Sequence, residues 1–352
     1  MMFKTITTLE QKMNKFPGVL FGAFRAATPA ALVAIGALWG LLPQPVQAQT
    51  KVRFVEVARS LMFAPAYAAI SKGYFKEAGL DVTFTTIPGG DKTMAALLSN
   101  SADIGLIGPE TAIYVWNSES PAKVKMFAGL AATDGFILAS REKLAKFDWK
   151  MLKGKDVLAF RPGSTPLAFF QSAMRKHGID PNKDVKLANN IPYPARVGSW
   201  LSGQNQFAIF DEPAMSQLER DGKAFPIVSI GKEVGAADYS AFMAPEKYIK
   251  DNPAVIQSWT NAMYKGMKWS ASAPTSELVK VLAEFFPGID ASILATAAER
   301  YRSLRIWKST PVIEPEAIKR FEDILVEAGV LENAKRVKFE NLVINDFARK
   351  AK

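Results

Sequence analysis

The same structural pattern occurs twice in this chain, and this repetition limits the possible fold more than any other feature. In "YFKEAGLDVTF", a short helix ends at Gly79 and Leu80-Asp81 leads into a strand of β-branched and aromatic residues. In "AMRKHGIDPNKDVKL", Gly178 and Ile179-Asp180 stand in the same place. Glycine after a helix commonly adopts the left-handed conformation that reverses the chain. A helix that returns directly into a strand predicts an α/β unit at each place.

A second similarity follows the first in both halves of the chain. "MAALLSNSADIGLIGPE" and "RVGSWLSGQNQFAIFDEP" each contain a helix with a Leu-Ser pair and a short apolar strand, and then a proline and an acid. One such match is expected by chance, but two in the same order are not. The sequence therefore predicts an α/β fold with two doubly wound lobes that are built alike.

The chain changes character after about residue 240. Four amphipathic helical segments follow, with N-terminal signals such as Asn252-Pro253 and Glu314-Pro315. No strand pattern accompanies them, so they form no sheet of their own. We expect them to pack on the first lobe.

The first 48 residues have the features of a secretory signal peptide. Four basic residues and one acid precede "AATPAALVAIGALWGLL", an uncharged run that ends before Pro43. A membrane anchor is the alternative, but Thr28, Pro29 and two glycines weaken this run as a spanning helix. We predict a cleaved signal peptide over residues 1–48, with cleavage after Ala48.

Composition excludes several classes of site. The chain has no cysteine and one histidine, His177, so a Cys/His metal site and a cysteine nucleophile are excluded, and a serine triad would need His177 itself. His177 follows Arg175-Lys176 at a helix end, where a helix-dipole partner is expected. The signal segment contributes +3 to the net charge of +10, so the remaining chain carries +7. The lysines of that remaining chain are scattered along the sequence. No stretch is typical of a nucleic-acid-binding patch.

Four stretches together resemble one family. They are "FAPAYAAISKGYFKEAGLDVTF", "GGDKTMAALLSNSADIGLIGP", "RPGSTPLAFFQSAMRKHGID" and "FAIFDEPA". They are similar to the periplasmic substrate-binding proteins of nitrate/sulfonate/taurine-type ABC importers and to relatives that bind pyrimidine precursors of thiamine. The resemblance implies a type II periplasmic binding protein, in which two crossovers join the lobes. Lobe one would comprise residues 49–139 and 240–352, and lobe two residues 140–239.

The resemblance places a ligand in the cleft between the lobes, where strands end and helices begin. Arg59 is suited to pair with an anionic head group, although a solvated loop arginine explains it equally well. Gly163-Ser164-Thr165 precedes a helix whose free N–H groups favour anions, although ordinary capping accounts for the same residues. The complete set of predicted ligand contacts is Arg59, Ser60, Met62, Glu110, Thr111, Thr133, Asp134, Gly163, Ser164, Thr165, Asp211 and Glu212.

Two adjacent acids conflict with a purely anionic ligand. Asp211 and Glu212 follow a strand, and the resemblance implies that an acid here lines the cleft or the hinge. Two acids favour an amino group or a ring nitrogen. A taurine-like zwitterion or a pyrimidine would satisfy both kinds of contact.

The resemblance implies a solute-binding component that captures a small anionic or zwitterionic solute, such as a sulfonate, taurine or nitrate. Lobe closure would hold this solute for delivery to an inner-membrane ABC permease. The alternatives are a pyrimidine, thiamine-precursor or other aromatic ligand, and a sensor domain without transport. A pyrimidine-synthase enzyme is disfavoured, because that family has a cysteine-rich motif and uses a histidine. We expect a periplasmic monomer with no catalytic residue, metal, cofactor or nucleic-acid partner.

Overall fold

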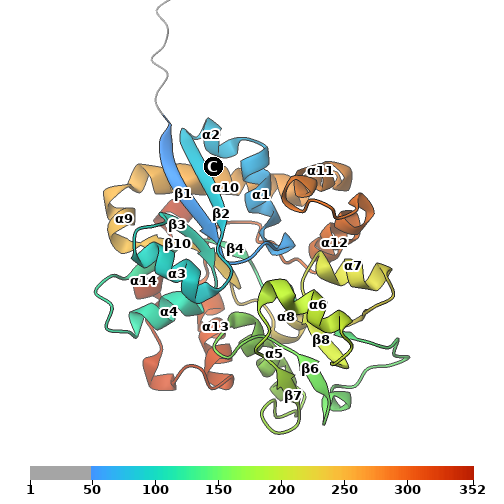
Figure 1. Cartoon of the computed structure of the whole chain (residues 1–352). Coiled ribbons are helices and arrows are strands. Elements are labelled where there is room, and N and C mark those ends of the chain that lie inside the picture. Colours follow the sequence, from blue (N-terminus) through green and yellow to red (C-terminus); the bar gives the residue numbers. More distant parts are fainter. Residues whose placement is uncertain (1–48) are drawn as a thin grey trace, which may run out of the picture. The chain divides into compact units, whose positions relative to one another are not determined.

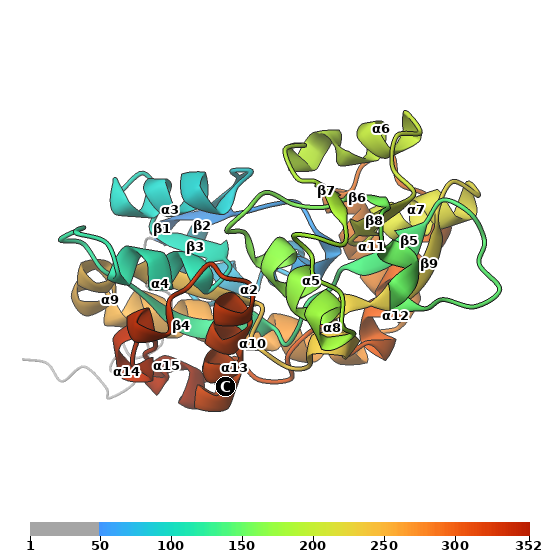
Figure 2. The same ribbon diagram turned by 90° about the horizontal axis from the view of Figure 1, so that it is seen from below.

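The computed structural model describes residues 49–352, and their strands form two five-stranded sheets (Figures 1 and 2). The predicted signal peptide and its cleavage site after Ala48 lie outside the described residues. In order across the sheet, the first sheet contains β2 (Leu80–Thr86), β1 (Thr50–Glu56), β3 (Ile104–Ile107), β10 (Ser240–Pro245) and β4 (Val124–Ala131). The second contains β7 (Lys186–Ala188), β6 (Asp156–Leu158), β8 (Phe207–Phe210), β5 (Ile137–Ser140) and β9 (Phe225–Ser229).

The two sheets have the same connectivity. In each, the first strand of the repeated pattern, β1 or β6, pairs in parallel with both of its neighbours. An antiparallel strand comes next, β10 in the first sheet and β5 in the second. These two strands are the crossovers. β5 follows β4 in the chain and leads from the first sheet into the second, and β10 follows β9 and leads from the second sheet back into the first. The predicted α/β fold with two similar lobes is confirmed. The first lobe contains the first sheet, and the second lobe contains the second sheet.

The repeated glycines make the predicted turns. Gly73 separates α1 (Ala64–Ser71) from α2 (Tyr74–Glu77), and Gly79 separates α2 from β2. Gly79 has a φ of 78° and Gly178 has a φ of 72°, both in the left-handed region. That region costs other residues roughly 1–2 kcal/mol, which explains why glycine stands at both reversals.

Short helices connect the strands within each lobe. The first lobe adds the 3₁₀ turn η2 (Leu61–Phe63) between β1 and α1. The other connecting helices are α3 (Gly90–Leu98), α4 (Glu110–Trp116), α5 (Thr165–Lys176), α6 (Arg196–Leu201), α7 (Ala214–Arg220) and α8 (Ile230–Val234). Further 3₁₀ turns are η3 (Trp149–Leu152), η4 (Tyr193–Ala195) and η5 (Asn333–Lys335).

The C-terminal helices cover the first lobe, as predicted, and two of them also contact the second. Gly266 lets α10 approach α1 closely, because a Cβ there would lie 2.4 Å from the carbonyl oxygen of Pro65. Two of the C-terminal helices also contact the second lobe. α12 packs on α7, and the ring centroid of Phe321 in α13 lies 5.4 Å from that of Phe169 in α5. These helices are α9 (Glu246–Asp251), α10 (Pro253–Ser272), α11 (Thr275–Phe285), α12 (Ala291–Ser303), α13 (Pro315–Glu327), α14 (Phe339–Leu342) and α15 (Asp346–Arg349).

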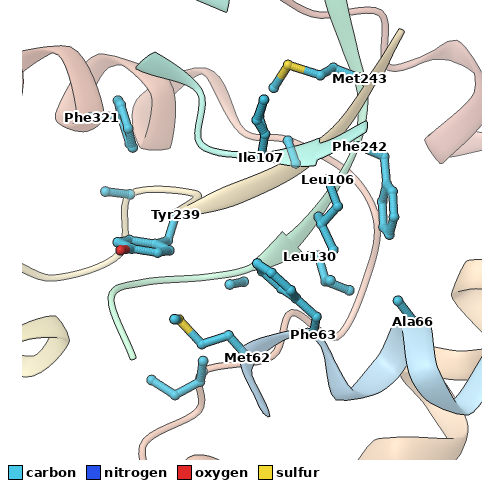
Figure 3. Packing of buried hydrophobic residues seen from close by; sticks show 14 of the residues in the cluster. Met62, Phe63, Ala66, Leu106, Ile107, Leu130, Tyr239, Phe242, Met243 and Phe321 are labelled. Carbon is cyan, nitrogen blue, oxygen red and sulfur yellow. The ribbon is translucent and has the colours of Figure 1, made fainter. Parts of the chain in front are cut away.

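The central strands of the first sheet are buried along their whole length. Every residue of β3 and of β10 is buried, as expected when helices cover both faces of a sheet. Figure 3 shows Leu106 and Phe242 from these strands near Phe63, in the turn after β1. Trp259 of α10 extends this core, with its ring centroid 5.0 Å from that of Phe54.

The domain boundaries predicted from the sequence stay a prediction. The strands nearest to them are β5, which begins at Ile137, and β10, which begins at Ser240. None of the helices within residues 49–352 combines the length and the apolar character needed to cross a membrane.

Substitution of Gly79 tests the turn that the sequence pattern predicts. The added methyl group of Gly79→Ala meets no atom within 4 Å, so the expected loss of about 1 kcal/mol comes from the backbone alone. Gly198 is a matched control, because it lies in α6 with open space around it and a φ outside the left-handed region. Gly198→Ala should stabilise the protein by up to about 1 kcal/mol in urea unfolding. Equal effects of the two substitutions would contradict this explanation.

Candidate functional site

A cavity of about 870 Å³ lies between the two lobes. Each parallel strand contributes residues that follow its carboxyl end, which is where open α/β sheets bind ligands. Phe136, Tyr239 and Ser240 from the two crossover segments complete the lining. In the first lobe the cavity is lined mainly by Ala58, Ser60, residues 88–92, Gly108, Glu110 and Thr111, and in the second by residues 160–166, residues 189–194 and Asp211.

Aromatic rings form one wall of the cavity. Phe160 packs edge-on against Phe136, with centroids 4.9 Å apart, and lies nearly parallel to Tyr193, at 6.2 Å. Arg196 supports Phe160, since its guanidinium carbon lies 3.8 Å from the ring centroid. That guanidinium is buried and donates to the carbonyl oxygens of Ala159 and Ile209. It therefore stabilises the wall and does not itself line the cavity.

Most of the predicted contacts lie in this cavity lining. The sequence placed them correctly at strand ends, because that position depends only on the order of the elements. Thr111 donates its hydroxyl to the carbonyl oxygen of Gly108 at 2.8 Å, and Ser164 donates to that of Arg161 at 2.7 Å. Neither side chain caps its helix. The predicted residues in the lining are Ser60, Met62, Glu110, Thr111, Gly163, Ser164, Thr165 and Asp211.

The structure places Arg59 outside the cavity lining. Its Nε lies 3.0 Å from Oε1 of Glu56, and its guanidinium carbon lies 4.7 Å from the centroid of Phe84. Glu56 is fully buried, and Tyr67 and Thr86 also donate to it. Burial raises the pKa of Glu56 to about 7, against the opposing effects of Thr86, Arg59 and Tyr67. Arg59 thus compensates a buried acid and does not face a ligand.

Glu212 also lies away from the cavity. Its side chain is completely buried and accepts from Ser216 at 2.9 Å and from Arg300 of α12 at 2.6 Å. The second Arg300 nitrogen donates to Glu219. Burial raises the pKa of Glu212, and Arg300 opposes that shift. Glu212 therefore joins the second lobe to a C-terminal helix.

Thr133 and Asp134 lie in the first crossover and not in the cavity lining. Thr133 donates its hydroxyl to the carbonyl oxygen of Gly235 at 2.6 Å. Asp134 accepts from the backbone N–H of Phe136 at 2.5 Å, and complete burial raises its pKa well above the ordinary value. Both residues hold the backbone of the crossover.

Asp211 lies in the cavity and links the lobes. Ser60 of the first lobe donates to its Oδ2 at 2.6 Å, and Tyr193 of the second donates at 2.9 Å. Burial raises the pKa of Asp211 to about 6, and these two hydroxyl groups oppose the shift. Asp211 is thus partly satisfied by the protein itself.

Three further contacts cross between the lobes beside the cavity. Arg161 pairs with Asp91 at 2.6 Å, although both side chains are more than half exposed. Tyr114 donates to the carbonyl oxygen of Gly163 at 3.0 Å, and the Tyr193 hydroxyl, whose hydrogen bonds mainly to Asp211, lies 3.3 Å from that of Arg59. Together with the bond between Ser60 and Asp211, these contacts hold the lobes against each other around the cavity.

The sequence interpretation missed two groups of cavity residues. Asn189, Asn190 and Tyr193 follow β7, and the strand-end rule that selected the other contacts would have found them. Tyr239 and Ser240 begin the second crossover, and no pattern in the sequence marks that position as part of the lining. His177, as expected, ends helix α5, where its Nε2 lies 2.5 Å from Glu233. No cluster of three potential metal-ligating side chains occurs within residues 49–352.

A cavity between the strand ends of two such lobes defines the periplasmic binding protein fold. The structure matches the periplasmic nitrate-binding protein NrtA from Synechocystis PCC 6803 with a TM-score of 0.72 at 15% identity, over 86% of this chain and 88% of that one. It matches the alkanesulfonate-binding protein SsuA from Xanthomonas axonopodis pv. citri, bound to MOPS, with a TM-score of 0.69 at 15% identity, over 86% and 100%. The resemblance inferred from the sequence is confirmed.

Sequence comparison gives the family. The model of the family described as NMT1/THI5 like matches residues 60–277. A curated protein of Bacillus subtilis (strain 168), "Putative binding protein YtlA", is 36% identical over 301 residues, which cover 86% of this chain and 90% of that protein. The chain belongs to the NMT1/THI5-like family.

The pair formed by Glu212 and Arg300 predicts a large stability effect. Glu212→Gln should lower the free energy of unfolding by about 2–4 kcal/mol, because it breaks an ion pair whose acid is completely buried and leaves Arg300 only the partly exposed Glu219. Glu219→Gln is the matched control, since Glu219 pairs with the same arginine but is 37% exposed, and it should cost less than about 1 kcal/mol. Denaturant unfolding of both variants measures the difference, and equal losses would contradict a structural role for Glu212.

The raised pKa of Glu56 predicts a pH dependence. The pKa of Glu56 is 4.5 in the unfolded chain and about 7 in the folded protein. Between pH 4.5 and about pH 7, the folded protein therefore keeps a proton that the unfolded chain releases. The free energy of unfolding of the wild type, relative to Glu56→Gln, should therefore be highest near pH 4. It should fall by about 3 kcal/mol up to about pH 8, since one pKa unit corresponds to about 1.4 kcal/mol. Urea unfolding of both proteins across this range tests the sign, and a difference that rises with pH would refute it.

Proposed function

We propose that this protein is the solute-binding component of an ABC import system. It captures a small organic solute in the cavity by closure of the two lobes and delivers it to an inner-membrane permease. The observation that carries this proposal is the cavity of about 870 Å³, lined from both lobes by the ends of their parallel strands. The volume lies in the ordinary range for small-molecule sites. The protein acts as a periplasmic monomer, through lobes formed by residues 49–139 with 240–352 and by residues 140–239.

The lining favours an aromatic or pyrimidine-like solute over nitrate or a sulfonate. The two buried acids, Glu110 and Asp211, line the cavity beside the aromatic wall. The basic residues of the lining, Lys92 and Arg161, are exposed, and Arg161 is already paired with Asp91. An anion enclosed here would meet two acids and no buried base among the lining residues, which is an unfavourable arrangement at low dielectric.

The proposed role requires binding without chemical conversion. The nitrate-binding and alkanesulfonate-binding proteins that share the fold are named for the ligands they bind. A sensor domain would bind its solute in the same way. Solute uptake by cells that carry or lack the gene separates the two roles, because only the transport role predicts a loss of uptake.

A thermal-shift panel tests capture. The purified protein is heated with sulfonates, taurine, nitrate, aromatic acids, pyrimidines and flavins, and a ligand at 100-fold over its Kd should add about 2.7 kcal/mol to the free energy of unfolding. Tyr193→Leu, which removes one ring of the wall, should weaken the best ligand about tenfold. Leu201→Ala, at an exposed position on α6, is the control and should leave its affinity unchanged. Absence of any ligand from the panel and from the purified protein would reject the proposal.

A further inference from the structure

Three buried polar side-chain atoms around the cavity have no hydrogen-bond partner within the described part of the chain. They are Oε2 of Glu110, Oγ1 of Thr165 and Oγ of Ser240. The exposed fractions of these residues are 6%, 3% and 2%. An unsatisfied buried polar group loses its hydrogen bonds to water without replacement, and native proteins contain few of them. Three in the lining of one cavity therefore require an explanation.

Two of these atoms, from Glu110 and Thr165, come together around Gly108, at the carboxyl end of β3. A Cβ on Gly108 would lie 2.1 Å from Oε2 of Glu110 and 2.5 Å from Oγ1 of Thr165. These two atoms are therefore close to each other, and the Thr165 hydroxyl lowers the pKa of the Glu110 carboxyl without the geometry of a full hydrogen bond. Ser240 precedes Ala241, which lies opposite Ile107 in the antiparallel pairing of β10 with β3, and it lines the same cavity. The first lobe, the second lobe and the second crossover each contribute one atom.

The chemistry of this cluster selects hydrogen-bond donors. A carboxylate accepts hydrogen bonds, and a hydroxyl group can accept as well as donate. Burial raises the pKa of Glu110, while the Thr165 hydroxyl and the charge of Arg161 oppose that shift. Arg161 is itself half exposed and paired with Asp91, and the other titratable groups near Glu110 are the phenols of Tyr114 and Tyr239. A charged donor would form strong charge-assisted hydrogen bonds here, whereas an anion would meet a carboxyl group with no buried base beside it.

We propose that Glu110, Thr165 and Ser240 form a subsite for the nitrogen-bearing end of the solute, an ammonium, amidine or ring-amino group with at least two N–H donors. This inference rests on the proposed function and names the ligand class of the same cavity. The flat body of the solute lies along the ring faces of Phe160 and Tyr193. Ser240 connects the subsite to hinge motion, because it is the first residue of the strand that leads back into the first lobe.

The ligand-free protein provides the first test. Ser240→Ala, Thr165→Val and Glu110→Gln remove or neutralise groups that lack protein partners, so each should leave the melting temperature unchanged or raise it slightly. Ser140→Ala is the matched control, because its buried hydroxyl donates to the carbonyl oxygen of Glu142 at 2.5 Å. Loss of that bond should lower the melting temperature by about 2–4 °C. If the three cavity variants lower the melting temperature as much as Ser140→Ala does, their side chains have a structural role and the proposal is wrong.

Binding provides the second test. Three probes share one ring and differ in their substituent: 4-aminopyrimidine, pyrimidine and pyrimidine-4-carboxylate. Calorimetry is done with these probes and with the best ligand of the thermal-shift panel. We expect that ligand to carry N–H donors, the amino probe to bind more tightly than the carboxylate, and Glu110→Gln to weaken the best ligand about tenfold or more.

The outcomes separate the two proposals. If the protein binds an anion without N–H donors, or if Glu110→Gln changes the affinity less than twofold, the subsite is wrong and solute capture still holds. If neither the probes nor any compound of the panel binds, and the purified protein carries no solute, the proposed function fails and the subsite fails with it. Ser140→Ala should retain wild-type affinity in every measurement.

Discussion

The buried hydroxyl group of Tyr301 joins the first crossover to the second lobe. This group donates to the carbonyl oxygen of Gly135 in the first crossover at 3.0 Å, and it accepts from the backbone N–H of Glu212, after β8, at 2.9 Å. Tyr301 is completely buried, so both bonds are shielded from water. The adjacent Arg300 compensates the Glu212 carboxylate. One turn of α12 thereby fixes the backbone from which the cavity is built.

Most of the fold could be predicted from the sequence, because it depends on local order. The glycine reversals at Gly79 and Gly178, and the strands after them, need only backbone preferences and the periodicity of apolar residues. The position of Ser240 in the cavity could not be predicted, since it depends on the insertion of β10 between β3 and β4. That pairing joins segments more than one hundred residues apart, and no local signal specifies it.

The candidate site was only partly predictable, for a related reason. A strand-end position predicts that a residue lies near a ligand, but not the direction of its side chain. Arg59 and Glu212 both follow strands and both turn away from the cavity to partners of opposite charge, Glu56 and Arg300. Pairing stabilises these two ions, and for these residues it overrides what the position in the sequence predicts. The charge of the cavity thus follows from which ions the fold already pairs.

The relatives show how little the fold determines the ligand. Proteins named for nitrate and for alkanesulfonates share this architecture at 15% identity. The connections after the strands form the cavity, and they vary without any change in the sheets. In this chain those connections bring two buried acids and an aromatic wall together.

The exchange of strands between the lobes affects the order in which the chain can fold. β10 separates β3 from β4 in the first sheet, and it is synthesised after every strand of the second sheet. Until Pro245 has been made, β4 has no neighbour in its own sheet and the first lobe cannot be completed. The second sheet needs only residues 137–229, which are continuous in the chain. The half of the molecule that begins first in the sequence is therefore the last to become a finished structure.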